Sequence, residues 1–274
     1  MERLYRFAER GSTRYAVERD GAVYALDTQI SHLGDILRRD SPGAAGAAGR
    51  IGNVGGAIEG GIASLALLPP VSPTKIVCVG LNYKDHAAEQ NQPLPAQPLI
   101  FIKPSTAVLG PGGTIRLPPG VGRVDHEAEL GVVIGRRAHR VKRAQAWDYV
   151  LGLICVNDVT ARDLQKQESQ YTRSKGFDTF APIGPCIAMG LDGAPRAVEG
   201  WVNGQRRQVS STTHLIFPID YLVEFISFVM TLEPGDIIST GTPAGIGPLV
   251  NGDTVTVKIE GVGELTNPVG DERS

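Results

Sequence analysis

The chain has 274 residues, which corresponds to one large domain or to one ordinary domain with a small companion. It contains 34 Gly and 19 Pro, whereas average usage gives about 33 of the two together. This excess excludes long-helix architectures, because both residues are poor in helix interiors. The 27 basic and 29 acidic side chains give a formal net charge of −2, with no long run of either sign to bind nucleic acid. No apolar stretch is long enough to span a bilayer, and the charged N-terminus does not resemble a signal peptide. We therefore expect a cytoplasmic protein with neither a nucleic-acid nor a membrane partner.

The first third of the chain predicts a small β-rich unit. Alternating runs over residues 4–27 indicate a β-meander, and residues 31–39 indicate a short helix. The glycine-rich residues 42–61 predict a loose connection. A proline-rich segment then leads into an apolar strand at residues 75–80. We place a domain boundary near residue 70, which gives an N-terminal domain of residues 1–70 and a catalytic domain of residues 71–274.

The second part of the chain predicts many strands and few helices. Helical periodicity covers residues 82–90 and 219–232, the latter with an apolar stripe that runs from Ile219 to Val229. Gly and Pro residues, Pro182 and Pro185 among them, indicate turns. The absence of a regular βα alternation favours a mixed or antiparallel β architecture. The predicted strands are residues 99–104, 126–135, 150–158, 201–205, 236–240 and 253–265.

Three acids stand where strands would bring them into the core. Glu127 and Glu129 alternate along one predicted strand and so project from the same face. Two carboxylates so close raise each other's pKa unless solvent, a proton or a cation relieves them. Asp158 ends an almost wholly apolar strand. Together the three would form an all-oxygen site suited to Mg²⁺ or Mn²⁺, or to Ca²⁺ in a loose cavity. The alternatives are two solvated glutamates on an exposed face and a helix cap at Asp158.

A histidine and further cations accompany the acids. His86 and Glu89 are i and i+3 neighbours on the predicted helix of residues 82–90, where a carboxylate could orient the imidazole as a general base. An ordinary pair on the helix surface is the alternative. Cations at strand or helix ends could hold a substrate carboxylate or an oxyanion, and they are Lys103, Arg162 and Lys175.

Five motifs occur in order along the chain: GLNYKDHAAE, VDHEAELGVVIG, NDVTARDLQ, SKGFDTFAPIGP and GDIISTGTPAGIGP. Over residues 71–269 they resemble the fumarylacetoacetate hydrolase superfamily, in particular its prokaryotic acylpyruvase and 2-hydroxyhepta-2,4-diene-1,7-dioate isomerase-like members. The resemblance implies an α+β, mostly β fold. In such a fold, a mixed β-sandwich roll follows a small β-rich N-terminal domain, and the assembly is a homodimer.

The resemblance also implies roles for individual residues. It makes Glu127, Glu129 and Asp158 the ligands of Mg²⁺ or a similar ion. The implied catalytic residues are His86, Glu89 and Lys175. The residues expected around the substrate are Tyr83, Lys103, Arg162, Gln165 and Thr242. Asp125 shares a face with the two glutamates, but the family does not normally use that position as a ligand.

The implied activity is that of a metal-dependent enzyme acting on a 2-oxo acid. Our main expectation is hydrolysis of a C–C bond of acylpyruvate or fumarylacetoacetate type through a metal-stabilised enolate. The alternatives that keep the same site are an isomerase or decarboxylase of 2-oxo or 2-hydroxy-diene dioates in aromatic catabolism, and an oxaloacetate decarboxylase or tautomerase. Outside enzymes, the alternative is a catalytically idle metal-binding protein.

Overall fold

The computed structural model describes residues 1–26, 33 and 54–272. The chain begins with the predicted antiparallel meander, which consists of β1 (Glu2–Glu9), β2 (Ser12–Arg19) and β3 (Ala22–Leu26). The turns Arg10–Gly11 and Asp20–Gly21 join these strands with positive φ at all four residues, and this backbone twist matches that of paired strands.

The predicted helix over residues 31–39 lies outside the described residues apart from Leu33, as do residues 42–53 of the glycine-rich connection. The described part of that connection resumes with β4 (Val54–Ala57), which pairs with β3. A 3₁₀ turn, η1 (Gly61–Ser64), and β5 (Ala66–Leu67), which pairs with β1, complete the N-terminal region.

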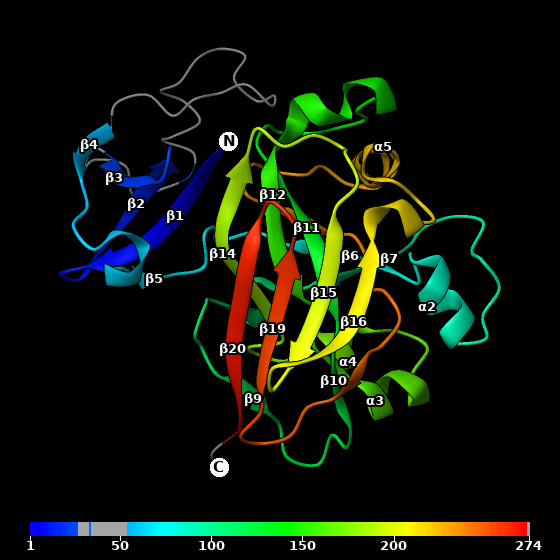
Figure 1. The fold of residues 1–274 in the computed structure, drawn as a ribbon. Helices are drawn as coiled ribbons and strands as arrows, with labels where there is room; N and C mark the ends of the chain where they lie inside the picture. Colours follow the sequence, from blue (N-terminus) through cyan, green and yellow to red (C-terminus); the bar gives the residue numbers. More distant parts are fainter. Residues whose placement is uncertain (27–32, 34–53, 273–274) are drawn as a thin grey trace.

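A mixed sheet of twelve strands runs through the whole molecule (Figure 1). Besides the N-terminal strands it contains β6 (Ile76–Gly80), β7 (Leu99–Lys103), β8 (Val108–Leu109), β11 (Ala128–Ile134), β12 (Val150–Asn157), β14 (Ala181–Met189) and β17 (Ile237–Ser239). Its order is β4-β3-β2-β1-β14-β12-β11-β17-β6-β7, with β5 on β1 and β8 on β14. Because β1 pairs with β14, the meander continues the central sheet. The domain boundary near residue 70 stays a prediction.

Two smaller sheets accompany the large one. The first has the order β16-β15-β19-β20-β9 and consists of β9 (Ile115–Leu117), β15 (Ala197–Val202), β16 (Gln205–Ser211), β19 (Thr254–Ile259) and β20 (Gly263–Asp271). The second has the order β13-β10-β18 and consists of β10 (Val124–His126), β13 (Thr160–Ala161) and β18 (Gly247–Pro248). Figure 1 shows β20, β19, β15 and β16 lying across the face of β14, β12 and β11. The fold is therefore α+β and mostly β with mixed sheets, as expected.

The helices are short. They are α2 (Lys84–Glu89), α3 (Arg162–Gln167), α4 (Thr172–Lys175) and α5 (Ile219–Val229), with 3₁₀ turns η2 (Ser105–Ala107), η3 (Arg143–Tyr149) and η4 (Thr212–His214). Both predicted helices are confirmed, but α5 ends at Val229, which is 54% exposed. The apolar stripe therefore stops at Ile226. Among the described residues, no helix has the length and apolarity needed to cross a membrane.

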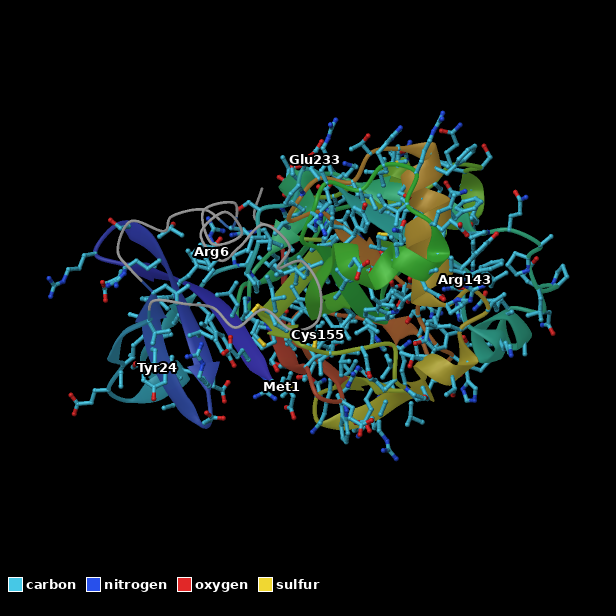
Figure 2. All side chains as sticks on the ribbon, turned by 90° about the horizontal axis from the view of Figure 1, so that it is seen from above. Met1, Arg6, Tyr24, Arg143, Cys155 and Glu233 are labelled. Carbon is cyan, nitrogen blue, oxygen red and sulfur yellow. The ribbon has the colours of Figure 1, made fainter. Side chains whose placement is uncertain are left out.

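The two largest apolar clusters of the described residues pack on opposite faces of the large sheet. Leu130 and Val132 of β11 pack with residues of the five-stranded sheet and α5, whereas Val133 packs in the cluster on the other face. Because strand side chains alternate, Glu129 lies on the same side as Val133, away from the five-stranded sheet. Seen from above, the meander that carries Tyr24 stands to one side of the larger body that carries Arg143 (Figure 2).

Four predictions need correction. The strand predicted over residues 201–205 contains the turn Asn203–Gly204 between β15 and β16. The strand predicted over residues 253–265 contains the turn between β19 and β20. The strand predicted over residues 126–135 is interrupted at Glu127, which separates β10 from β11. Pro182 and Pro185, which indicated turns, lie inside β14. The register between β12 and β14 shifts between Leu153 and Cys155, opposite residues 184–188. The regular ladder is broken there, so it does not need the N–H that Pro185 lacks.

Candidate active site

Three carboxylates meet at the start of β11 and the end of β12. Glu129 is on β11, Glu127 precedes that strand, and Asp158 follows the last residue of β12. The amide of Asp158 donates to the carbonyl of Glu127 at 2.9 Å. Each acid is at most 5% exposed, and one ligand oxygen from each lies within 4.8 Å of the others. The structure therefore brings together the three acids singled out from the sequence, in the interior rather than on a solvated face.

The two glutamates carry opposite electrostatic shifts. Burial raises the pKa of Glu129 to about 8, and the charges of Asp158 and Glu127 add to the rise. Its Oε2 accepts hydrogen bonds from the Ser239 hydroxyl at 2.6 Å and the Gly241 amide at 2.9 Å. Burial would also raise the pKa of Glu127, but Lys175 and Arg162 outweigh it and hold that pKa well below its ordinary range.

Cationic side chains surround the acids. Lys175 Nζ donates to Glu127 Oε2 at 2.8 Å and to Asp158 Oδ2 at 2.6 Å. Lys103, which has no exposed surface, donates to the other oxygen of Asp158 at 2.5 Å and to the Val159 carbonyl at 2.9 Å. These are the Lys103 and Lys175 of the sequence prediction. Lys175 stays protonated, because Asp158 and Glu127 outweigh the effect of burial and raise its pKa.

Arg162 links the acidic cluster to a fourth carboxylate. It donates to Glu127, to the Gln165 side chain, and through Nε to Asp125 Oδ2 at 2.8 Å. Arg123 donates to the other oxygen of Asp125 at 2.6 Å. Asp125 is thus neutralised by two guanidinium groups, which agrees with the expectation that it is not a ligand.

The chemistry of the donor set fits a divalent cation. Glu127, Glu129 and Asp158 offer carboxylate oxygens only, the ligands that Mg²⁺ and Mn²⁺ prefer. The raised pKa of Glu129 marks negative charge that the neighbouring cations leave uncompensated, and a bound divalent ion would compensate it. Two buried donors, the Tyr83 hydroxyl and Asn157 Nδ2, have no partner among the described residues. The charge of Glu129 acts on the Tyr83 hydroxyl, which therefore lies near the cluster.

The predicted dyad forms on α2. His86 Nδ1 and Glu89 Oε2 are 2.9 Å apart, and Glu89 Oε1 accepts a hydrogen bond from the Gly245 amide at 2.9 Å. His86 is 7% exposed. Its charge, when present, lowers the pKa of Glu127, so the buried imidazole lies within electrostatic reach of the acids.

The loop after β17 is hydrogen-bonded to a buried glutamine, Gln208, which the sequence analysis did not identify. Gln208 Oε1 accepts from the Ala128 amide at 2.9 Å, and its Nε2 donates to Thr242 Oγ1 and to the Pro243 carbonyl, both at 2.8 Å. Thr242 itself donates to the Ala128 carbonyl at 3.0 Å. The hydroxyl of Thr242 is therefore engaged on both sides. No local pattern on β16 distinguishes Gln208, because its partners lie far away in sequence.

Comparisons with known proteins agree with this geometry. A family model described as "Fumarylacetoacetate (FAA) hydrolase C-terminal" matches residues 75–270. The chain is similar to the crystal structure of 2-hydroxyhepta-2,4-diene-1,7-dioate isomerase from Mycobacterium marinum, with 40% identity, a TM-score of 0.84 and 100% of both chains covered. It is 42% identical to a mitochondrial oxaloacetate tautomerase of Arabidopsis thaliana over 70% of this chain and 89% of that one. It is also similar to fumarylpyruvate hydrolase from Pseudomonas aeruginosa in complex with Mn²⁺ and pyruvate. That match has 32% identity, covers 72% of this chain and 90% of that one, and has a TM-score of 0.67.

Proposed function

Because the chain belongs to the fumarylacetoacetate hydrolase family, we propose that it is a metal-dependent isomerase or tautomerase of a 2-oxo acid. The observation that carries the proposal is a buried triad of carboxylates next to an oriented histidine. Two of the named relatives, an isomerase and an oxaloacetate tautomerase, support this activity over the hydrolysis that was our main expectation from the sequence. Isomerisation and tautomerisation of a 2-oxo acid require a proton to be moved to or from the carbon beside the carbonyl.

Glu127, Glu129 and Asp158 would hold the ion, which we propose to be Mg²⁺ or Mn²⁺. When bound, the ion supplies Lewis-acid polarisation of the carbonyl and carboxylate oxygens of a 2-oxo acid. Lys175 would keep its ammonium beside the same oxygens and stabilise negative charge that develops on them. Lys103 would hold Asp158 in place, because its side chain is bound at both Asp158 and Val159.

His86 would carry the proton. With Nδ1–H donated to Glu89, the unprotonated nitrogen of a neutral imidazole is Nε2. Nε2 would take a proton from the carbon beside the substrate carbonyl. The proton would then go to the enolate oxygen, which gives the enol, or to a conjugated carbon, which shifts the double bond. Glu89, held by the Gly245 amide, keeps the tautomer and the ring orientation fixed.

The remaining predicted residues would bind the rest of the substrate. Arg162 and Gln165 are joined to each other and offer a guanidinium and an amide at the edge of the acid cluster. Tyr83 offers a buried hydroxyl that has no partner among the described residues. Thr242 would have to exchange one of its two present hydrogen bonds to reach a ligand. The proposed partner is a small 2-oxo acid, and the proposed assembly is a homodimer, which a mass measurement in solution tests.

Hydrolysis of a C–C bond is the second candidate, and the dyad itself favours it. An imidazole oriented by a carboxylate can activate a water molecule as readily as it accepts a proton from carbon. A relative in complex with Mn²⁺ and pyruvate carries the name fumarylpyruvate hydrolase. In this alternative His86 would take a proton from water, which attacks the distal carbonyl. The C–C bond then breaks, and the leaving enolate takes up a proton, while the other residues keep their roles.

A panel of substrates separates the candidates. We expect enzyme treated with EDTA to be inactive, and Mg²⁺ or Mn²⁺ to restore keto–enol exchange of oxaloacetate or isomerisation of 2-hydroxyhepta-2,4-diene-1,7-dioate. Turnover of acetylpyruvate to acetate and pyruvate as the only activity would favour the hydrolase instead. Turnover that survives complete removal of metal would refute both.

A histidine variant tests the dyad. His86→Ala should lower kcat by about 10²- to 10⁴-fold while Mn²⁺ binding stays intact. His139→Ala is the matched control, because His139 is exposed and, among the described residues, its Nδ1 contacts the Thr231 hydroxyl alone, at 3.3 Å. An unchanged rate in His86→Ala would mean that another group moves the proton.

A further inference from the structure

Strand β16 contacts helix α2, which carries the His86–Glu89 dyad. Gln208 and Ser210 lie two residues apart and share one face of the strand, whereas Val209 between them is 58% exposed. Gln208 holds the loop that contains Thr242. Ser210 contacts α2, on the other side of the dyad.

The contact with α2 is a charge-assisted hydrogen bond. Ser210 Oγ donates to Asp85 Oδ2 at 2.7 Å, and such bonds are stronger than neutral ones. The other carboxylate oxygen of Asp85 accepts from the His86 amide at 2.8 Å. A single side chain thus joins the backbone of the catalytic histidine to β16.

The direction of the Ser210 proton follows from its second neighbour. His214 Nδ1 lies 2.9 Å from Ser210 Oγ. A hydroxyl has one proton, and the Asp85 carboxylate can only accept, so Ser210 receives the hydrogen bond from an Nδ1–H of His214. This arrangement also excludes activation of Ser210 as a nucleophile by His214, because the imidazole donates to it rather than removing its proton.

The helix needs such support because it is short. α2 has six residues, and a helix of this length has little stability of its own. Before it, Asn82 is bonded to the backbone of Phe217 and Thr240. After His86, Glu89 is bonded to the Gly245 amide. Among the hydrogen bonds of the described residues, the one from Ser210 holds the turn between these two anchors.

We propose that Ser210 is a positioning residue that fixes the first turn of α2 and thereby sets the orientation of the His86 imidazole, with His214 fixing the direction of the Ser210 hydroxyl. The inference rests on the proposed role of His86 in proton transfer. It adds to that role a supporting residue, Ser210, which is on the five-stranded sheet and lies 125 residues from Asp85 in the sequence.

The test compares three variants of the full-length protein. Ser210→Ala removes the hydroxyl, Ser210→Thr restores it on a side chain suited to a strand, and Ser64→Ala is the control. The exposed Ser64 hydroxyl contacts carbonyls of its own N-terminal turn, Gly61 at 2.8 Å and Glu59 at 3.1 Å. We expect Ser210→Ala to lower kcat/KM about tenfold, the scale of one hydrogen bond to a charged group. Ser210→Thr should recover most of the loss.

Hydrogen exchange of metal-loaded protein without substrate gives the second measurement. The amides of residues 84–90 should exchange about tenfold faster in Ser210→Ala, while Mn²⁺ affinity and exchange in β11 and β12 stay unchanged. If the wild type turns over none of the substrates but exchange in α2 still rises, the proposed function fails and the support by Ser210 stands. Unchanged exchange in α2, or a rate loss that Ser210→Thr does not recover, would overturn the inference. Faster exchange throughout the protein would do the same, because it would show a general loss of stability.

Discussion

Glu127 and Glu129 are two residues apart, yet their pKa values move in opposite directions. Glu127 contacts the ammonium of Lys175 and the guanidinium of Arg162. Glu129 receives only a hydroxyl and an amide hydrogen bond and faces two other carboxylates. The nearby cations therefore compensate the negative charge of Glu127. The charge of Glu129 must be compensated by a proton or a metal ion. Cation placement, rather than burial, distinguishes the two acids.

The affinity for metal should depend on pH through Glu129. Since its pKa is raised to about 8, a metal ion must displace a proton below that pH, and the apparent affinity for Mn²⁺ should rise about tenfold per pH unit up to about pH 8. Titration calorimetry between pH 6 and 9 measures this. The Glu129→Gln variant should bind more weakly and without this slope. An affinity that is flat from pH 6 to 8 in the wild type would contradict the raised pKa.

The same proton affects the stability of the metal-free protein, with a definite sign. The folded protein keeps the proton on Glu129 above pH 4.5, the ordinary value at which the unfolded chain loses it. The contribution of this group to stability is therefore full below pH 4.5 and declines as the pH rises toward 8. Thermal unfolding in EDTA across this range should show the decline in the wild type, and Glu129→Gln should lack it.

Lys103 offers a test of charge compensation. Lys103→Met should destabilise the metal-free protein by about 3 kcal/mol, because it leaves the buried carboxylate of Asp158 with one cation fewer. Saturating Mn²⁺ should raise the melting temperature of this variant more than that of the wild type. Lys142→Met, at an exposed position, is the control and should behave like the wild type. Equal stabilisation of all three by metal would mean that Lys103 does not compensate Asp158.

Residues joined by local geometry could be predicted from the sequence, and those joined across the fold could not. His86 and Glu89 follow from helical spacing, and Glu127, Glu129 and Asp158 follow from alternation and from the end of an apolar strand. Gln208 and Ser210 gave no such signal, because their partners at Ala128 and Asp85 are 80 and 125 residues away. Only the packing of the five-stranded sheet on the large one brings these pairs together.

At the scale of elements, the loop of residues 241–247 depends on a close approach of two backbones. Gly245 has φ +96°, and a Cβ there would lie 2.1 Å from the carbonyl oxygen of Arg207 on β16. The Gly245 amide that holds Glu89 is thus placed by direct contact with that strand. Glycine is required at this position for its conformation and for its lack of a side chain.

Gly245→Ala should separate these two requirements when compared with Gly252→Ala. Gly252 has a similar φ of +91°, but nothing lies within 4 Å of the position that a Cβ would take there. Gly252→Ala should therefore cost only the strain of positive φ, about 1 kcal/mol. Gly245→Ala should cost more and should lower kcat/KM by at least about tenfold, because the loop must move away from β16 and Glu89 loses its anchor. Denaturant unfolding and steady-state kinetics measure both effects. Equal behaviour of the two variants would show that the close approach has no functional consequence.

Periodicity identified most strands but not their interruptions. The break at Glu127 occurs where the chain passes from β10 in the three-stranded sheet to β11 in the large sheet. Nothing in an alternating pattern marks such a change of partner. The prolines of β14 indicated turns because a regular strand needs their missing N–H groups. The register shift of β12 against residues 184–188 removes that need at Pro185.

At the scale of the whole molecule, one continuous sheet joins the N-terminal meander to the acids. β1 pairs with β14, which pairs with β12, and β12 leads directly into Asp158. Composition and motifs indicated a separate small unit before residue 70, but the order of strands in a sheet depends on contacts between distant segments. Strand order was therefore beyond the reach of the sequence, whereas the fold class was not.

Leu4→Ala tests whether the meander and the central sheet unfold together. Leu4 has no exposed surface and packs in the same cluster as Ile76 and Met189, so its truncation should lower the free energy of unfolding by about 3 kcal/mol. We expect a single transition with coincident fluorescence and circular-dichroism curves. Leu94→Ala, at a side chain that is 56% exposed, should change stability little. A separate early transition in Leu4→Ala would instead show that the meander is an independent unit.

The alternation along β16 makes the proposed active site sensitive to the length of a strand that supplies none of its proposed catalytic or metal-binding residues. Inserting one residue between Gln208 and Ser210 would turn either side chain outward, since facing reverses with every added residue. An insertion of two residues would restore the facing. Tolerance to insertions at this position should therefore follow an odd–even rule, in contrast to the β15–β16 turn at Asn203–Gly204, where added residues leave both side chains in place.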